Sequence, residues 1–339
     1  MNKKIFHIVS SKRYTGGAQV AYLWHKALLD GGIESFFVYK GGYKLQEKLK
    51  NEKNTIPYFN LIDKTMKILK FSKNSLVLAH LSEDHWLSSI FGGKKEKVLV
   101  FHTKFRKDLL HRLTYRKNIK AIFAYKPKEK PIFKNFKIFP PVYDLNLYFR
   151  GNQPSNMLNI CTIGKIEKER GHHKFIFLCN ELKKLNFKFN GYVIGKGSHL
   201  QKLKDLRDEF NLKKEIEFLG YFEDEELAKI LRKMDILVWT SPGSQLSHRA
   251  IVEAILCGAL PSSYEMEGID FWIQDGKSGI ILSDDLKESA EKIIEIFENK
   301  EKYTKIRDNS FKETIEKVDP KKFVESFIKF LYENNPSSA

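Results

Sequence analysis

The sequence predicts an α/β fold with two doubly wound parallel sheets. Short apolar segments alternate with longer amphipathic ones, which is the pattern of parallel strands covered by helices on both faces. The alternation stops once, in PPVYDLNLYFRGNQPSN, where Pro, Gly and Asn are frequent, and then restarts. The length of 339 residues also exceeds what one compact core usually carries. We therefore expect one domain over residues 1–150 and a second from residue 151.

The N-terminal half begins with a strand and a helix. KIFHIVS is a continuous apolar strand, and GGAQVAYLWHKALLDGG is a helix that starts at Gly16-Gly17 and ends at Gly31-Gly32. The later strands are IESFFVY, SLVLAHLS, KVLVFHT, IKAIFAY and FKIFPP. Their continuous apolar character predicts burial on both faces of the sheet.

The second half repeats the alternation of strands and helices. The strands are MLNICTIG, FKFNGYVIG, IEFLG and DILVWTS, and the helices that follow them are GHHKFIFLCNELKKL, SHLQKLKDLRDEF, DEELAKILRKM and SHRAIVEAILCG. ALPSSY and SGIILS are further strands, and helices are expected at about residues 284–298, 302–316 and 320–333. Ligands in such sheets bind beyond the carboxyl ends of the strands.

The composition, with 42% apolar and 30% charged residues, is that of an ordinary globular protein. Its apolar runs are far shorter than the roughly 20 residues that span a bilayer, and MNKKIFHIVSSK has too short an apolar core for a signal peptide. The three cysteines, Cys161, Cys179 and Cys257, lie among apolar neighbours without metal or redox spacing. We expect a reduced, cytoplasmic protein.

Most of the positive charge is concentrated in one segment. Residues 94–137 contain 15 Lys or Arg and three acidic residues, so they carry +12 of the net charge of +17. Such a segment favours a polyanionic partner, which is either a nucleic acid or an anionic membrane face. An ordinary solvated surface would also account for it.

Three loops at predicted strand ends have residues that suit a phosphate. In SSKRYTGGAQ, Gly16 and Gly17 open a helix, where N–H groups without a nearby Cβ can approach an anion. In TIGKIEKERG, Lys165 and Arg170 flank a loop, and two cations there could neutralise a diphosphate. YVIGKG, with Gly195, lacks the third glycine of a dinucleotide fingerprint and is a weak signal. Each loop is also compatible with a tight turn or with surface charge.

Two further stretches carry candidate site residues. His102 lies at the end of the predicted strand KVLVFHT. Active-site groups collect at the ends of strands in this architecture, although a single histidine is more often structural. SQLSHRAIVEAILCGALP predicts a helix that Ser247 caps and Gly258 ends, with an N-terminus that offers N–H donors to an anion. Glu253 is the one acid in this apolar helix. It either accepts hydrogen bonds from ribose hydroxyls or is a tolerated acid at a helix boundary.

Taken together, these stretches resemble glycosyltransferase family 4, which contains retaining enzymes of the GT-B fold. The resemblance covers most of the chain and rests on TGGAQ, FHT, TIGKIEKERG, YVIGKG, IEFLGYFEDEELAKIL and SQLSHRAIVEAILCGALP, in the family's order and spacing. It implies two Rossmann-like domains facing across a cleft, with residues 1–150 on the acceptor side and 151–317 on the nucleotide-sugar side. It also implies a C-terminal helix over 318–339 that packs back toward the N-terminal domain.

The resemblance assigns roles by position. Gly17 would lend its N–H to the diphosphate region, and Gln19 would contact the acceptor. His102 matches the histidine near the transferred sugar, while Lys165 and Arg170 match the pair that holds the diphosphate, so these three are the implied catalytic residues. The implied donor-binding residues are Gly16, Gly17, Gly195, Tyr221, Phe222, Gln245, Ser247, Arg249 and Glu253. Among these, Tyr221 and Phe222 would lie near the nucleobase, and Glu253 matches the ribose-binding second glutamate of the Glu-x7-Glu signature.

The sequence departs from the family pattern in several places. Gln245 replaces the first glutamate of the signature, and an amide forms hydrogen bonds but brings no charge. Lys165 and Arg170 exchange the usual arginine and lysine, which keeps the charge but changes the geometry. Phe271 stands where a glutamate is expected. These differences leave the identity of the donor open, and they are compatible with a specialised or weakly active enzyme.

The resemblance implies transfer of a sugar, with retention, from a nucleotide-diphosphate sugar to a glycan or lipid-linked acceptor in cell-surface glycan synthesis, without a cofactor or metal. Residues 94–137 would then dock on anionic lipid at the inner face of the cytoplasmic membrane. Two alternatives remain open. One is a non-catalytic nucleic-acid-binding protein, although no recognised module is present and we expect no nucleic-acid partner. The other is a GT-B nucleotide-sugar epimerase, for which acid/base groups cannot be assigned.

Overall fold

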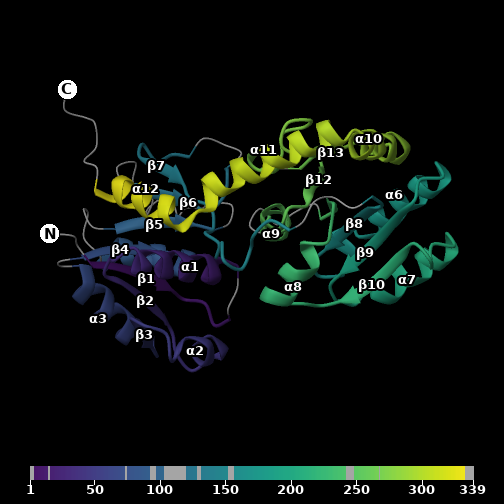
Figure 1. Ribbon diagram of the computed structural model, residues 1–339. Coiled ribbons are helices and arrows are strands. Elements are labelled where there is room, and N and C mark those ends of the chain that lie inside the picture. Colours follow the sequence, from purple (N-terminus) through teal and green to yellow (C-terminus); the bar gives the residue numbers. More distant parts are fainter. Residues whose placement is uncertain are drawn as a thin grey trace. The chain divides into compact units, whose positions relative to one another are not determined.

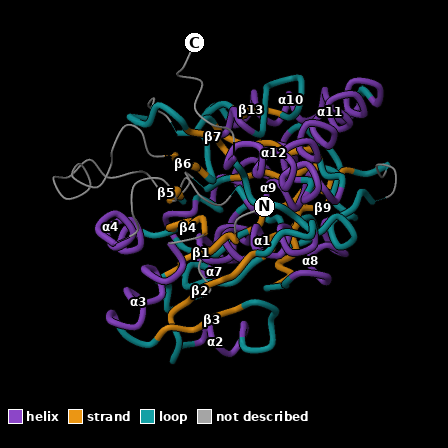
Figure 2. Tube along the Cα trace, turned by 90° about the vertical axis from the view of Figure 1, so that its left-hand side faces the viewer, coloured by secondary structure: helices purple, strands orange, loops and turns teal. Residues whose placement is uncertain are grey.

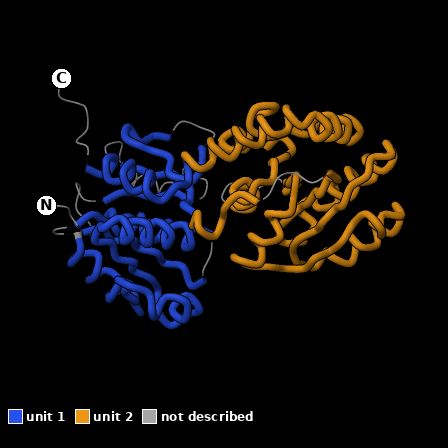
Figure 3. The backbone as a smooth tube through the Cα atoms, in the orientation of Figure 1, with its two compact units in different colours: residues 1–143, 317–339 blue, residues 144–316 orange. Residues whose placement is uncertain are grey.

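The computed structural model describes residues 4–13, 16–72, 75–91, 97–102, 120–127, 131–151, 156–241, 248–266 and 268–332. The chain divides into two compact units (Figure 3). Unit 1 comprises residues 1–143 and 317–339, and unit 2 comprises residues 144–316. Each unit contains one parallel sheet, so the predicted α/β class with two doubly wound domains is confirmed.

Unit 1 has a seven-stranded parallel sheet in the order β3-β2-β1-β4-β5-β6-β7 (Figure 1). The strands are β1 (Lys4–Val9), β2 (Ser35–Lys40), β3 (Thr55–Tyr58), β4 (Ser75–Ala79), β5 (Lys97–Phe101), β6 (Lys120–Phe123) and β7 (Phe136–Ile138). The helices are α1 (Gly16–Asp30), α2 (Lys44–Leu49), α3 (Leu61–Ser72), α4 (Ser82–Phe91) and α12 (Pro320–Tyr332). The strand order reverses between β1 and β4, and ligands bind at the carboxyl ends of strands at such a point.

Both faces of the unit 1 sheet are buried. Successive residues of a strand point to opposite faces, and β1 is apolar on both. Ile5 packs in one cluster with Trp24 of α1 and Phe327 of α12, whereas Phe6 packs in another with Ile68 of α3. Helices α1 and α12 therefore cover one face, and α3 and α4 cover the other (Figure 2). The last helix of the chain thus completes the core around the first strand.

One strand of unit 1 is missing from the sequence prediction. β3 pairs in parallel with β2 at the edge of the sheet. It contains Pro57, which an edge strand tolerates because one of its sides has no ladder hydrogen bonds to lose. Four residues with a central proline carry no recognisable strand pattern, which explains why the strand was missed.

Unit 2 has a six-stranded parallel sheet in the order β10-β9-β8-β11-β12-β13. The strands are β8 (Leu158–Ile163), β9 (Phe189–Ile194), β10 (Ile216–Gly220), β11 (Ile236–Trp239), β12 (Leu260–Tyr264) and β13 (Ile280–Leu282). The helices are α6 (His173–Lys184), α7 (Leu200–Glu209), α8 (Asp224–Leu231), α9 (Arg249–Cys257), α10 (Leu286–Glu298) and α11 (Lys300–Val318), with short 3-10 turns at Lys168–Arg170 and Ile269–Phe271. The strand order reverses between β8 and β11. In the ranges described, no helix is both long and apolar enough to cross a membrane.

Candidate functional site

The loops that follow β8, β9 and β10 are tied together at the carboxyl edge of the unit 2 sheet. The N–H of Gly164 donates to the carbonyl of Ile194 at 3.0 Å, and that of Gly195 donates to the carbonyl of Gly220 at 2.7 Å. Gly195 has a φ of +144°, and a Cβ there would lie 1.9 Å from the Gly164 oxygen. This close approach of two loops explains the glycine at position 195.

Lys165 lies on the exposed part of the β8 loop. Its ammonium lies 3.0 Å from Oε1 of Glu167, whose other oxygen accepts a 2.5 Å hydrogen bond from Ser198. The hydroxyl of Ser198 and the Lys165 ammonium hold the pKa of the Glu167 carboxyl below its ordinary value. Lys165 therefore borders the loops after both β8 and β9.

Arg170 ends the short 3-10 turn after β8 and reaches the end of β11. Its guanidinium donates to Oγ of Ser241 at 3.2 Å, and its carbonyl accepts a hydrogen bond from the Thr240 hydroxyl, also at 3.2 Å. Gly171 permits this contact, because a Cβ there would lie 2.7 Å from the Thr240 oxygen. The arginine is thus fixed at the point where the strand order of unit 2 reverses.

A cavity of about 230 Å³ lies next to this turn. It is lined by residues in the loop after β8 and at the carboxyl ends of β11 and β12, including Gly171, Trp239, Ser241 and Tyr264. The Trp239 Nε1 and the Tyr264 hydroxyl are buried and lack a hydrogen-bond partner within the described ranges. Buried polar groups in proteins are nearly always paired, so these two mark a place for a polar ligand. Trp239, Ser241 and Tyr264 were not predicted as site residues, because they belong to no motif that can be recognised in the sequence.

Glu253 lies in the second turn of α9 and is almost fully buried. Its Oε1 accepts a 3.1 Å hydrogen bond from the Tyr148 hydroxyl and pairs with the Arg249 guanidinium one turn earlier. Burial raises the pKa of Glu253 above its ordinary value, while Arg249 and Tyr148 oppose that rise. The helix ends at Gly258, which has a φ of +98°, and this confirms the predicted C-cap. Tyr148 is a partner that the sequence did not reveal.

The predicted nucleobase residues lie at the end of β10. Tyr221 is half-exposed, its ring lies 4.2 Å from the Lys196 ammonium, and its hydroxyl bonds Glu223. Phe222, its neighbour, is partly buried. The Arg249 guanidinium, besides pairing with Glu253, lies 3.6 Å from the Asp224 carboxylate at the start of α8. Ion pairs thus connect the start of α8 with α9.

In unit 1, the predicted residues gather around the start of α1. Gly16 and Gly17 open the helix, and Gln19 lies partly buried in its first turn. A Cβ on Gly17 would lie 3.2 Å from Cβ and Cγ of His102, so Gly17 and His102 are in direct contact. Nε2 of His102 lies 2.8 Å from Nδ1 of His80, which directly follows β4.

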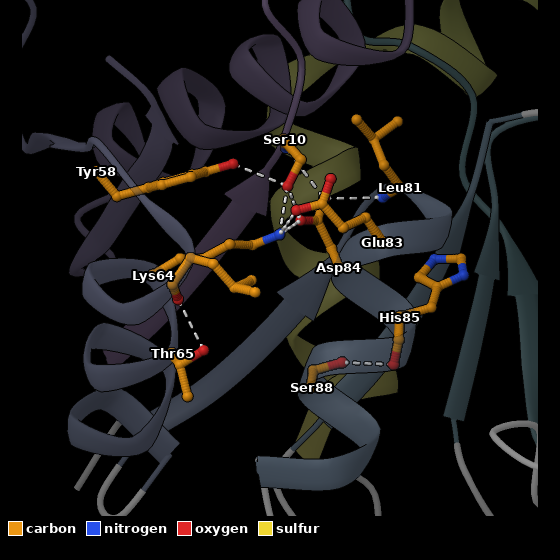
Figure 4. A network of polar contacts seen from close by, with 10 residues as sticks. Ser10, Tyr58, Lys64, Thr65, Leu81, Glu83, Asp84, His85 and Ser88 are labelled. Carbon is orange, nitrogen blue, oxygen red and sulfur yellow. Dashed lines mark hydrogen bonds and ion pairs between the residues drawn. The ribbon is translucent and has the colours of Figure 1, made fainter.

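A second polar cluster lies at the end of β1 (Figure 4). The fully buried ammonium of Lys64 lies 2.7 Å from Asp84 Oδ1 and 3.0 Å from Glu83 Oε1. Ser10 bonds both Lys64 and Asp84 and accepts a 2.9 Å hydrogen bond from the Tyr58 hydroxyl. All the donors and acceptors in this cluster satisfy one another, which indicates a structural role in joining β1, β3, α3 and α4.

Some predicted residues lie outside the described ranges. These are Gln245, Ser247 and most of the cations of residues 94–137. His248 precedes the first turn of α9 and its side chain makes no cap hydrogen bond. In the described part of the basic segment, three lysines bond within unit 1: Lys97 donates to the Ser89 carbonyl, Lys120 to the last turn of α12, and Lys137 to Ser326.

The sites in both units consist of hydrogen-bonding and charged groups at sheet edges. Cys161, Cys179 and Cys257 are buried and form no disulfide with one another. Throughout the described ranges, no group of three or more His, Cys, Asp or Glu residues is arranged to hold a metal ion.

Comparison with known proteins agrees with this architecture. Residues 148–313 match the family model of glycosyl transferases group 1. Residues 148–313 are thus similar to the glycosyl transferases group 1 family. The matched segment lies entirely within unit 2, which holds Arg170 and Glu253.

Similarity to individual proteins and solved structures extends over more of the chain. An uncharacterised glycosyltransferase of Methanocaldococcus jannaschii is 26% identical over 250 residues, which cover 68% of this chain and 61% of that relative. HepE of Anabaena, solved in complex with UDP, superposes with a TM-score of 0.80 at 15% identity, covering 97% of this chain and 99% of that chain. A glycosyltransferase from Rickettsia africae gives a TM-score of 0.79 at 15% identity, covering 98% and 100%. These structures show that the fold is GT-B.

Proposed function

We propose that this protein is a retaining glycosyltransferase of family 4 that transfers a sugar from a nucleoside diphosphate sugar to a hydroxyl acceptor. The observation that carries this proposal is the arrangement at the carboxyl edge of the unit 2 sheet. There, Arg170 is bound to Ser241 where the strand order reverses, beside a cavity with unpaired polar groups. The same unit contains the buried carboxylate of Glu253. Two structures of HepE, which shares the fold, contain UDP and UDP with glucose, so a uridine nucleotide is the first ligand to test.

The proposed reaction breaks the bond between the anomeric carbon and the diphosphate oxygen and forms a bond from that carbon to the acceptor oxygen. The leaving nucleoside diphosphate takes the bonding electron pair, and its phosphate oxygen takes the proton that the acceptor hydroxyl releases. Lys165 and Arg170 would stabilise the negative charge that grows on the leaving group. Glu253 would accept hydrogen bonds from the ribose, His102 would lie near the transferred sugar and Gln19 near the acceptor. The proposal requires no protein nucleophile, metal ion or cofactor.

We further propose that the acceptor is a cell-surface glycan precursor on a lipid carrier, at the inner face of the cytoplasmic membrane. The support is the charge of residues 94–137. Because Lys97, Lys120 and Lys137 bond within unit 1, the contact would depend on the other cations of this segment. Flotation with vesicles that contain anionic lipid should exceed flotation with neutral vesicles at low salt. Equal flotation in both would contradict the membrane contact.

A thermal-shift panel tests the donor. UDP, GDP, ADP and their sugar conjugates are added to the full chain, and a ligand that binds only the folded state raises the melting temperature. The ligand with the largest shift is then incubated with a hydroxyl acceptor, and the products are identified by mass spectrometry and NMR. A glycosylated acceptor supports the proposal, whereas an epimerised nucleotide sugar would identify an epimerase. A panel without any shift, together with a salt-sensitive shift of RNA or duplex DNA, would favour the nucleic-acid-binding alternative.

A further inference from the structure

Three buried histidines form a row across the sheet of unit 1. His7 lies on β1, His80 directly follows β4, and His102 directly follows β5, so they come from three neighbouring strands. Nδ1 of His7 lies 3.0 Å from Nε2 of His80, and Nδ1 of His80 lies 2.8 Å from Nε2 of His102. The ring centroids are 5.1 Å apart in both pairs. We call these residues the histidine row.

The three rings of the histidine row are neutral at physiological pH. Burial lowers the pKa of His102 to about 3 and lowers those of His7 and His80 well below their ordinary value. The fully buried indole of Trp24 packs against the row, with its centroid 6.0 Å from that of His80 and 5.9 Å from that of His102. Each ring therefore carries one proton on one of its two nitrogens.

Counting protons leaves two arrangements of the row. Each of the two contacts needs one N–H donor and one lone-pair acceptor. If His102 donates from Nε2, then His80 must donate from its own Nε2 to His7, and His7 must keep its proton on Nε2. If His7 instead donates from Nδ1, all three protons lie on Nδ1. The three residues consequently share one tautomer, and they change it together.

The two ends of the row are not equivalent. Nε2 of His7 and Nδ1 of His102 are both buried, and the described residues supply neither with a hydrogen-bond partner. Leaving a buried polar group unpaired is unfavourable, so each end needs an explanation. His7 lies inside β1, whereas His102 directly follows β5, and Cβ, Cγ and Cδ2 of its side chain lie against the start of α1 at Gly17. The His102 end of the row is therefore at the carboxyl edge of the sheet, where parallel sheets bind their ligands.

We propose that His80 and His7 are positioning residues that set the tautomer of His102, and that a donor oxygen completes the row at Nδ1 of His102. The identity of this ligand rests on the proposed function, but the coupling of the three tautomers does not. A phosphate oxygen, which only accepts hydrogen bonds, selects the arrangement with the protons on Nδ1. A hydroxyl satisfies either arrangement.

The change between the two arrangements conserves protons and charge. The proton between His80 and His7 moves onto Nδ1 of His7, and the proton between His102 and His80 moves onto Nδ1 of His80. Because Nε2 of His7 and Nδ1 of His102 are buried, the first loses its proton to water and the second gains one from water when local opening of unit 1 exposes them. Every ring keeps one proton, so a tautomer chosen at one end of the row is imposed on the other end.

Long-range proton–nitrogen NMR of the ¹⁵N-histidine-labelled full chain tests the row, because it distinguishes protonated from unprotonated ring nitrogens. In the free, unmutated protein, we expect His7, His80 and His102 to have the same tautomer. In His7→Phe, we expect the His102 ring signals to shift, although the two residues do not touch. His25→Phe is the control for packing beside the row, because the buried His25 ring lies edge-on to His7 with centroids 6.0 Å apart but hydrogen-bonds Ser35 and Lys53 and not the row. It should leave the His102 tautomer unchanged.

Activity separates positioning from folding. We expect His7→Phe to lower kcat about tenfold, the effect of losing roughly one hydrogen bond, with little change in donor KM. Different tautomers within the row of the unmutated protein, or unchanged His102 signals in a folded His7→Phe variant, would overturn the proposal. If His7→Phe does not fold, the unmutated protein still decides the matter. If no nucleotide sugar binds, the proposed function fails, whereas the tautomers of the free protein still test the row.

Discussion

Gly17 lies directly against His102. A Cβ added to Gly17 would lie only 3.2 Å from both Cβ and Cγ of the histidine. This contact joins the start of α1 to the end of β5, two segments that are far apart in the sequence. Gly17→Ala should push the His102 ring by a few tenths of an ångström. We expect kcat/KM to fall about tenfold, while the free energy of unfolding changes by less than about 1 kcal/mol.

Gly16→Ala provides the stability control for this prediction, because nothing lies within 4 Å of a Cβ at that position. Chemical denaturation of both variants separates the effect of an alanine at the helix start from the effect of the contact with His102. Loss of most of the folding stability in Gly17→Ala alone would show that the contact has a structural role instead.

Arg170→Ala and Lys165→Ala should each lower kcat about 10²–10³-fold, because each removes a charged donor from the leaving diphosphate. Lys184→Ala is the matched control, since Lys184 is similarly exposed in unit 2 but lies in the last turn of α6. Steady-state kinetics and melting temperatures of all three variants are compared. Wild-type rates in both Arg170→Ala and Lys165→Ala would remove this site from the mechanism.

Glu253→Gln should weaken nucleotide binding through the ribose. We expect UDP to bind the unmutated protein about tenfold more tightly than 2′,3′-dideoxy-UDP, which corresponds to about 1.4 kcal/mol. In Glu253→Gln, this preference should largely disappear, because the amide is a weaker acceptor than a carboxylate. Isothermal titration of both ligands against both proteins gives the coupling free energy between Glu253 and the ribose hydroxyls. An undiminished preference in the variant would place the ribose elsewhere.

Lys64→Met should destabilise unit 1 strongly. It leaves the fully buried Asp84 carboxylate without its cation, a change that typically costs about 3–5 kcal/mol. Lys67→Met is the control on the same helix, because its ion pair with Asp63 is partly exposed and contributes about 1 kcal/mol or less. Urea denaturation measures both. Similar losses of unfolding free energy in the two variants would argue against a stabilising role for the cluster of Ser10, Tyr58, Lys64, Glu83 and Asp84 in Figure 4.

Acidification should destabilise the protein through its buried histidines. Burial lowers the pKa of His25, His172 and His248 from 6.5 to about 4, so between these values the unfolded chain binds more protons than the folded one. The free energy of unfolding must therefore fall as the pH is lowered from 6.5 toward 4, by at most about 1.4 kcal/mol per pH unit for each histidine.

Denaturation at a series of pH values measures this slope. His25→Gln removes one of the titrating groups, so its slope should be smaller than that of the unmutated protein over the same range. An identical slope in the two proteins would show that His25 is not buried as a neutral ring.

Much of the fold could be predicted from the sequence because its signals are local. Continuous apolar strands, glycine-bounded helices and the Gly258 cap depend on neighbours a few residues away, and the structure confirms them. The edge strand β3 escaped prediction, because Pro57 and its short length weaken the local pattern. Within the site, the sequence singled out Gly17, His102 and Glu253 but not the residues that hold them.

The sequence by itself determined the fold class, the resemblance of residues 148–313 to group 1 glycosyl transferases and the charged residues proposed to bind a diphosphate. Only the tertiary structure decided which partners these residues have. It placed Tyr148 on Glu253, Ser241 on Arg170 and the row of His7 and His80 behind His102. Such partners come from strands and loops that are distant in the sequence, and parallel strands bring them together only when the sheet forms. The spacing of residues within one segment carries no information about these long-range contacts, so a single sequence cannot reveal them.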